Sequence, residues 1–277
     1  MPARQGFAAW DNHSGLVAEV KVRFDAAADY ERFMGAWSRA IGETFLAWLG
    51  APPAARWLDV GCGSGAFSEL IVRRAAPTSL AGIDPSSEQI DYAREHLPGP
   101  AFEVADALAL PFGDESFDVV ASALVLHFIA DRRRALAEMK RVLRPRGLVG
   151  GYTWKRTASE DFAPYAPVMA AVRSIGAEPL TSPLVPEGSA AGMRESLAAA
   201  GFSEIETIEI EVTRTFASFD EYWQVQALPF SPPGRTIAKL DPAQRAKLKD
   251  MLRQRMSAGS DGRITHAATA VAGKGRR

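Results

Sequence analysis

The chain has 277 residues, of which 47% are hydrophobic and 23% are charged. These values are ordinary for a globular protein and exclude a wholly disordered or collagen-like chain. The single cysteine, Cys62, excludes an intramolecular disulfide and a cysteine-rich zinc site. The net charge of −1 is unevenly distributed, since residues 239–277 hold ten Lys or Arg against three Asp and so carry +7. Such a basic segment is typical of a solvated helix and terminus, or of an RNA-binding surface.

The first 20 residues include the charged residues Arg4, Asp11 and Glu19 and lack the unbroken apolar stretch of a signal peptide. The longest apolar run, residues 119–130, is shorter than the roughly 20 residues needed to cross a bilayer. We therefore expect a cytoplasmic protein with no membrane segment.

The first predicted element is a helical cap within residues 1–50. Apolar residues between Tyr30 and Ile41 recur at spacings of three and four, which predicts one or two amphipathic helices over 29–49. Strands then alternate with helices, and the predicted strands are 56–60, 80–83, 101–104, 117–123 and 148–153. Asp131 is the predicted N-cap of the helix before the fifth strand. This alternation predicts a parallel sheet with helices on both faces over residues 55–154.

The pattern changes after residue 154. Residues 155–188 contain several prolines and little periodicity, which predicts short helices and loops. The elements predicted after them are a helix over 189–200 closed by Gly201, a strand over 204–216, a proline-broken helical segment over 218–258 and a last strand over 263–272. We expect a single domain, 1–277, in which 155–188 and 217–262 form lid insertions and 263–277 forms the last strand and a basic tail.

The segment LDVGCGSGA (58–66) places three glycines between the first strand and the next helix. Glycines permit positive φ and let a ligand approach the bare backbone. In open parallel sheets, ligands bind at the carboxyl ends of the strands, where the strand order reverses. We therefore interpret this segment as a ligand site rather than a plain turn.

A dinucleotide is one candidate ligand, because residues 61–66 fit the loose dinucleotide fingerprint and Asp84 follows about 20 residues on. Two further acids favour a different ligand. Asp59 would bring a negative charge close to a pyrophosphate, and Asp106 ends the third strand. This acidic rim suits a cofactor that combines a cationic amino-acid tail with a ribose and an adenine.

Four segments carry a family resemblance: LDVGCGSG (58–65), GIDPS (82–86), EVADALALPFGDESFDVV (103–120) and RVLRPRG (141–147). Over about residues 55–150 the chain resembles the class I S-adenosylmethionine-dependent methyltransferases, in particular the subgroup that includes ubiquinone-biosynthesis C-methyltransferases. The resemblance implies an α/β, Rossmann-like, mostly parallel seven-stranded sheet with an antiparallel last strand beside the fifth. It also implies S-adenosyl-L-methionine as cofactor. One departure is Arg146, where the family usually has glycine.

The resemblance also implies individual cofactor contacts. Asp59, Gly61 and Gly63 would face the methionine moiety, and Asp84, followed by Pro85, would accept hydrogen bonds from both ribose hydroxyls. The other implied contacts are those of Asp106 with the adenine amine, of Ala107 and Leu108 with the adenine ring, and of Ser122 and Leu124 with the methionine end. The candidates for holding the cofactor carboxylate are Tyr30 and Arg39.

Methyl transfer from a sulfonium depends mainly on alignment and on exclusion of water, because the leaving group is neutral. His127, shortly after the fourth strand, is the candidate general base, with packing beside the cofactor as its alternative role. No grouped carboxylates indicate a catechol-type magnesium site, so we expect no metal. The candidate substrate-wall residues lie outside the resemblance: Tyr30, Met34, Trp37, Ser38, Arg39, Tyr152, Trp154, Tyr222, Trp223 and Phe230.

The sequence therefore predicts a methyltransferase that acts on O, N or C of a small-molecule acceptor, without a nucleic-acid partner. Three alternatives stay open: a tRNA methyltransferase, suggested by the basic C-terminal region; a non-catalytic S-adenosylmethionine-binding regulatory protein; and an NAD-dependent oxidoreductase. The acceptor and the oligomeric state are also left open.

Overall fold

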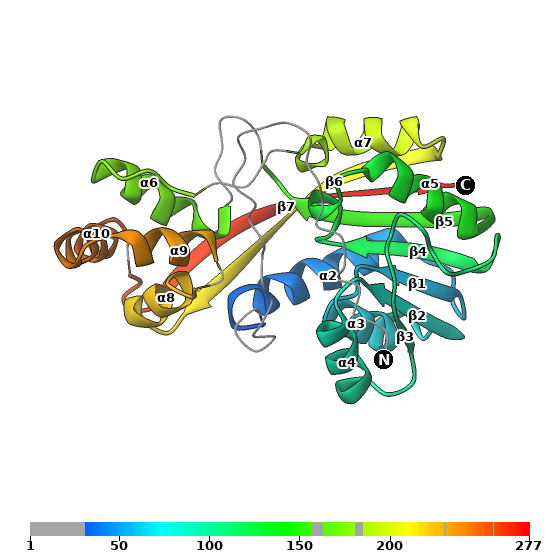
Figure 1. Ribbon diagram of the computed structural model, residues 1–277, viewed down its shortest axis with the longest axis horizontal. Coiled ribbons are helices and arrows are strands. Elements are labelled where there is room, and N and C mark those ends of the chain that lie inside the picture. The colour runs from blue at the N-terminus through cyan, green and yellow to red at the C-terminus, as the bar shows by residue number, and fades with distance from the viewer. Residues whose placement is uncertain (1–30, 157–162, 181–184, 230, 257) are drawn as a thin grey trace, which may run out of the picture.

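The computed structural model describes residues 31–156, 163–180, 185–229, 231–256 and 258–277. They form a seven-stranded sheet of order β3-β2-β1-β4-β5-β7-β6 (Figure 1). The strands are β1 (Arg56–Val60), β2 (Ser79–Asp84), β3 (Ala101–Val104), β4 (Phe117–Ala123), β5 (Leu143–Trp154), β6 (Ser203–Phe216) and β7 (Ile264–Arg276). Strands β1 to β5 run parallel, and β7 lies antiparallel between β5 and β6. The predicted fold class is confirmed, including the antiparallel last strand beside the fifth.

The helices of the described residues follow the predicted order. They are α2 (Ala36–Leu49), α3 (Ala66–Ala75), α4 (Ser87–His96), α5 (Arg132–Val142), α6 (Ala166–Ser174), α7 (Ala190–Ala199), α8 (Phe219–Gln226), α9 (Pro232–Lys239) and α10 (Pro242–Arg255). A π-helical turn, η1 (Glu31–Gly35), precedes α2, and three 3₁₀ turns are η2 (Leu126–Phe128), η3 (Ala163–Tyr165) and η4 (Pro186–Gly188). Asp131 caps α5 as predicted, because its carboxylate accepts the N–H of Arg134.

Helices cover both faces of the sheet because successive strand side chains point to opposite sides. Trp57, Val119 and Tyr152 pack in one core cluster with residues of α2 and α3. Their chain neighbours Leu58 and Val120 pack on the other face with residues of α5 and α7. The near-continuous apolar strands of the sequence therefore match a sheet that is buried on both faces.

The fifth strand is longer than predicted. It begins at Leu143 rather than at residue 148, because Leu143 pairs with Phe117 before the register shifts. Arg146 adopts a φ of 62°, in the left-handed region that glycine tolerates best. Arg277 supports this irregular part of β5, since the N–H of Arg146 donates to the carbonyl of Arg277. The departure from the family's glycine thus lies within a supported irregularity of the strand.

Strands β6 and β7 extend past the other strands, and α6, α8, α9 and α10 gather around their far end (Figure 1). We call these four helices the helical lobe. The two predicted insertions meet in it, because Gln226 Nε2 donates to Pro164 O at 3.0 Å and Leu180 N donates to Thr236 Oγ1 at 3.1 Å. A lid role for the lobe stays a prediction.

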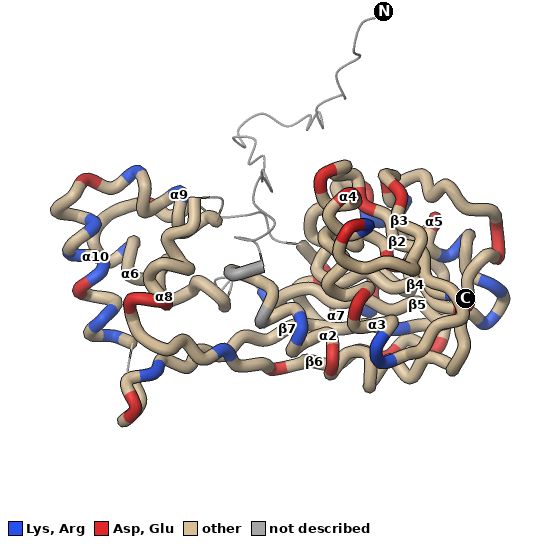
Figure 2. The backbone as a smooth tube through the Cα atoms, turned by 90° about the horizontal axis from the view of Figure 1, so that it is seen from below, with Lys and Arg blue, Asp and Glu red and all other residues tan. Residues whose placement is uncertain are grey.

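The basic C-terminal region does not form one surface. Helix α10 belongs to the helical lobe, whereas β7 ends beside the core of the sheet, at the opposite end of the molecule (Figure 2). Several of its cations are paired: Lys249 and Arg253 contact Asp220, and Arg277 contacts Glu115. Among the helices that the structure describes, none has the length and apolar character needed to cross a membrane.

Candidate functional site

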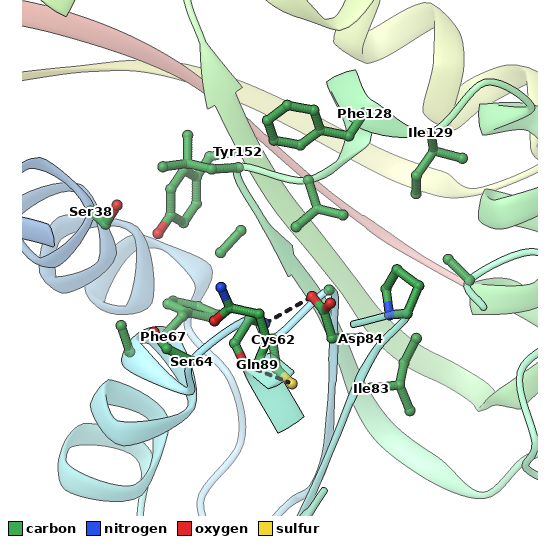
Figure 3. A pocket seen from close by; sticks show the side chains of 18 of the residues that line it. Ser38, Cys62, Ser64, Phe67, Ile83, Asp84, Gln89, Phe128, Ile129 and Tyr152 are labelled. Atoms are coloured by element: carbon green, nitrogen blue, oxygen red, sulfur yellow. Dashed lines mark hydrogen bonds between the residues drawn. The ribbon is translucent and has the colours of Figure 1, made fainter. Parts of the chain in front are cut away.

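A cavity of about 400 Å³ opens at the carboxyl ends of the parallel strands, where the strand order reverses between β1 and β4 (Figure 3). This volume is typical of a small-molecule or cofactor site. The predicted site residues that line it are Ser38, Gly61, Gly63, Asp84, Pro85, Asp106, Ala107, Leu124 and Tyr152. The structure thus brings together residues from five strand ends and from α2.

The glycine loop after β1 forms the floor of this cavity. Gly61, Gly63 and Gly65 all have positive φ, between 52° and 88°. The N–H groups of Gly61 and Cys62 both donate to the carbonyl of Ile83, which joins the loop to the end of β2. A Cβ on Gly61 would lie 2.5 Å from the methyl carbons of Val125. The loop is therefore a tight turn in which glycine is required, and its backbone is open to a ligand at Gly63.

Asp84 lies at the end of β2 and faces the glycine loop (Figure 3). Its Oδ2 accepts the N–H of Gly63, and its Oδ1 accepts the N–H of Ser86, both at 3.0 Å. Burial raises the pKa of this carboxyl, and the two backbone donors oppose that effect. A carboxylate has about four acceptor positions, so two are left for further donors. This arrangement fits a vicinal diol such as a ribose.

The loop after β3 brings Asp106 and Ala107 to the same cavity. This loop has little regular structure, and side chains of α5 hydrogen-bond to its backbone. Arg134 Nε donates to Leu108 O, and Glu138 accepts the N–H of Leu110, both at 2.9 Å. Leu108 itself packs into the core below rather than lining the cavity.

Leu124 follows β4 with a φ of 60°, which is uncommon for a bulky residue. Its N–H donates to the carbonyl of Tyr152, and this bond holds the strained turn against β5. Ser122 is fully buried, lies outside the cavity lining, and its hydroxyl has no partner among the described residues. The implied cofactor contact of Ser122 stays a prediction.

Residues 58–150 match a protein-family model described as a methyltransferase domain. They form a class I S-adenosylmethionine-dependent methyltransferase domain. The cofactor of this family fits the cavity described above, because Asp84 and Asp106 offer carboxylates to a nucleoside and the glycine loop leaves room beside Gly63.

Relatives and solved structures agree with this assignment. The chain is 38% identical over 133 residues to the malonyl-[acyl-carrier protein] O-methyltransferase of Methylococcus capsulatus, covering 46% of this chain and 48% of that protein. It is 39% identical over 90 residues to the demethylmenaquinone methyltransferase of Thermotoga maritima, covering 32% and 39%. The chain thus spans less than half the length of these curated relatives. Phosphoethanolamine N-methyltransferase 2 of Haemonchus contortus, solved with S-adenosyl-L-methionine, shares the fold (TM-score 0.54, 17% identity, 94% of this chain and 60% of that chain).

Asp59 of the methyltransferase domain lies outside the cavity lining. The residue is fully buried, its Oδ2 accepts the Ser68 hydroxyl at 2.7 Å, and its Oδ1 has no partner among the described residues. Burial raises the pKa of its carboxyl to about 7, against the lowering effect of the Ser68 hydrogen bond. The carboxylate of Asp59 therefore joins β1 to α3 within the core, and direct contact with a methionine moiety stays a prediction.

His127 is partly buried and also lies outside the cavity lining. Its Nδ1 is 3.0 Å from Thr153 Oγ1 on β5. Burial, together with the positive charge of Arg156, lowers the pKa of its imidazole to about 4, so the ring is neutral at pH 7. A neutral ring has the correct protonation state for a base, but its contact is with β5 and its role in catalysis stays a prediction.

The other predicted substrate-wall residues are scattered. Trp37 and Trp154 are buried and pack edge to face, with ring centroids 6.1 Å apart, rather than lining the cavity. Tyr222 and Trp223 lie in the helical lobe, Met34 is buried and Arg39 is exposed. Tyr30 and Phe230 lie outside the described residues.

The structure adds lining residues that sequence reasoning missed, among them Gln89, Phe128 and Ile129. Ser86 and Gln89 have the spacing of a capping box, in which the Gln89 side chain would bond the Ser86 N–H. Asp84 takes that N–H instead. The buried side chain of Gln89 is therefore left at the cavity wall (Figure 3). Its Oε1 would lie 3.9 Å from a Cβ built on Gly63. Within the described part of the chain, no cluster of three or more His, Cys, Asp and Glu side chains could hold a metal.

Proposed function

We propose that this protein is a methyltransferase that uses S-adenosyl-L-methionine to methylate O, N or C of a small-molecule acceptor. The observation that carries the proposal is the composition of one continuous cavity. One end presents the Asp84 carboxylate and the glycine loop, and the other presents the side chains of Phe128, Tyr152 and Ser38 (Figure 3). A cofactor with a polar nucleoside and a reactive end fits such a cavity, with space for an acceptor beyond it.

S-adenosyl-L-methionine, when bound, supplies an electrophilic methyl group on a positively charged sulfur. Asp84 would hold the ribose, and Asp106 and Ala107 would hold the adenine. The bare backbone at Gly63 would let the methionine part approach closely. Leu124, Phe128 and Tyr152 would exclude water and align the acceptor, which is the main requirement of an in-line displacement.

The acceptor class rests on the named relatives. One acts on malonyl-[acyl-carrier protein] and another on demethylmenaquinone, according to their names. Neither is a nucleic acid, and the division of the basic C-terminal region between two ends of this molecule also disfavours a single RNA-binding surface. We therefore propose a small molecule, or a small group presented by a carrier.

Calorimetry with S-adenosylhomocysteine tests the cofactor site through Asp84→Ala. A hydrogen bond to a charged group contributes about 1.5–3 kcal/mol, so loss of two ribose contacts should raise the Kd at least ~100-fold. The matched control is Asp91→Asn, because Asp91 lies on the exposed face of α4, pairs with Arg94 and does not line the cavity. Unchanged affinity in Asp84→Ala would contradict the ribose assignment.

Three further assays separate the remaining alternatives. Thermal stabilisation by NADH and not by S-adenosylhomocysteine would indicate an oxidoreductase. Salt-sensitive filter binding of bulk tRNA would indicate a tRNA methyltransferase. Transfer of a labelled methyl group from S-adenosylmethionine to a malonyl thioester or to a demethylated naphthoquinol distinguishes an enzyme from a non-catalytic binding protein, and we expect transfer to one acceptor of this kind.

A further inference from the structure

An ion pair between a buried carboxylate and a partly exposed arginine lies behind one wall of the cavity. Glu187, in η4, is 2% exposed, and its Oε1 accepts the hydroxyl of Ser196 on α7 at 2.7 Å. Its Oε2 lies 3.2 Å from Nε of Arg132, the first residue of α5, at an angle that does not make a hydrogen bond. Among the described residues, the positive charge of Arg132 therefore offsets the negative charge on the buried Oε2 of Glu187. Such a carboxylate is costly to leave unpaired.

Arg132 also bonds to the cavity wall. Its Nη1 donates to the carbonyl of Ile129 at 2.9 Å, and Ile129 and the adjacent Phe128 line the cavity. Phe128 is 57% exposed, and its ring lies against that of His127, with the ring centroids 4.0 Å apart. The wall segment 124–131 is thus held by Arg132 on one side and by the contact of His127 with Thr153 on the other.

The η4 turn that carries Glu187 is itself firmly placed. The carbonyl of Gly188 accepts the N–H of Arg156, just after β5, at 2.9 Å. A Cβ on Gly188 would lie 2.7 Å from the carbonyl oxygen of Arg156, so glycine is required for this approach. Ser189 then caps α7 by accepting the N–H of Gly192. The pair therefore connects the end of the 155–188 insertion to the cavity wall.

We propose that Arg132 and Glu187 are positioning residues that fix Phe128 and Ile129 at the cofactor site by coupling the wall segment to η4. The inference rests on the proposed function, since it names residues that shape the same site. Arg132 suits this task because one guanidinium can bond the Ile129 carbonyl and face a carboxylate at the same time. Glu187 supplies the fixed charge that holds the guanidinium in that orientation.

Glu187→Gln tests the coupling, because it removes the charge and keeps the shape. We expect the Kd for S-adenosylhomocysteine to rise about tenfold, a usual size for loss of coupling to a binding site. We also expect faster amide hydrogen exchange in segment 124–131 without ligand. The matched control is Glu209→Gln, which breaks the exposed ion pair with Lys155 at 3.0 Å and touches no wall residue. It should leave both measurements unchanged.

The double variant Arg132→Gln with Glu187→Gln guards against simple destabilisation, because it removes both charges of the pair and leaves neither one unpaired. If the pair has a positioning role, the double variant should regain the melting temperature that Glu187→Gln lowers. It should still show the weaker affinity for S-adenosylhomocysteine and the faster amide exchange in segment 124–131. Recovery of all three properties would show a purely structural pair and overturn the proposal. Wild-type affinity and exchange in Glu187→Gln would also overturn it. Failure of the wild type to bind S-adenosylhomocysteine would instead refute the proposed function, and the exchange measurement would still report on the coupling.

Discussion

Asp59 gives a quantitative prediction about stability and pH. Its carboxyl is fully buried beneath the glycine loop, and its pKa rises from an ordinary 3.8 to about 7, chiefly because burial disfavours the charged form. The folded state therefore holds a proton that the unfolded state releases. The resulting stability is complete below about pH 4 and is lost as the pH rises through 7. A shift of about three pKa units corresponds to about 4 kcal/mol, of which roughly 2–3 kcal/mol disappears between pH 5 and pH 8.

Asp59→Asn removes this titration and keeps the size of the side chain. Urea unfolding at pH 5 and pH 8 should show the wild type losing roughly 2–3 kcal/mol relative to the variant across that interval. Ser68→Ala should move the loss to higher pH, because the Ser68 hydroxyl stabilises the charged carboxylate. A constant difference in unfolding free energy between wild type and Asp59→Asn at the two pH values would refute the reasoning.

Two other substitutions test the floor and wall of the cavity. Gly61→Ala places a Cβ 2.5 Å from Val125 at a φ of 77°. We expect the free energy of unfolding, measured by urea unfolding, to fall by about 1–3 kcal/mol. The second substitution Val125→Ala should restore part of this loss. Equal stability of Gly61→Ala and wild type would contradict this packing. Gln89→Ala should weaken S-adenosylhomocysteine binding about tenfold in calorimetry. We expect little change in its melting temperature, because no described protein group bonds the Gln89 carboxamide; unaltered affinity would place that side chain outside the ligand contacts.

The sheet could be predicted from the sequence because each strand carries a local signal. The apolar run 117–123 and the segment 56–60 before the glycines form β4 and β1 with the predicted bounds. The start of β5 gave no such signal, since LRPRG reads as a turn and pairs with β4 only through Leu143. Its strand character depends on the neighbouring strand and on the bond between Arg146 and Arg277, which are distant in sequence.

The end of the cavity that holds Asp84 and the glycine loop was predictable for the same reason, and the opposite end was not. Asp84 and Gly63 belong to short motifs at strand ends, and the fold brings strand ends together. Trp37, Trp154 and Tyr152 are all aromatic and have similar apolar surroundings in the sequence. Periodicity cannot distinguish an aromatic residue that fills the core from one that faces a ligand, and only Tyr152 lines the cavity. The place of Gln89 in the cavity wall could not be predicted, because the S-x-x-Q spacing predicts a helix cap.

The two ends of the cavity are also fixed by different forces. Backbone hydrogen bonds place the end that holds Asp84 and the glycine loop, since the N–H groups of Gly61 and Cys62 both donate to the carbonyl of Ile83. Packing places the other end, where α2 brings Ser38 towards Tyr152 (Figure 3). Gly42 eases this approach, because a Cβ there would lie 2.6 Å from Leu70 Cδ1, which would have to move, and 3.5 Å from the Tyr152 hydroxyl.

Gly63 and Asp84, at one end of the cavity, lie within the segment 58–150 that matches the methyltransferase family model. Helix α2, at the other end, lies before that segment. Members of a family that retain the glycine loop and Asp84 can therefore differ in acceptor through different packing of helices outside the matched segment. This division agrees with relatives that match this chain over a common region and carry names for acceptors as different as malonyl-[acyl-carrier protein] and demethylmenaquinone. On this argument, we expect the acceptor of the proposed methyltransferase to be selected by the contacts of α2 and Tyr152, and substitutions there should alter acceptor choice while cofactor affinity is retained.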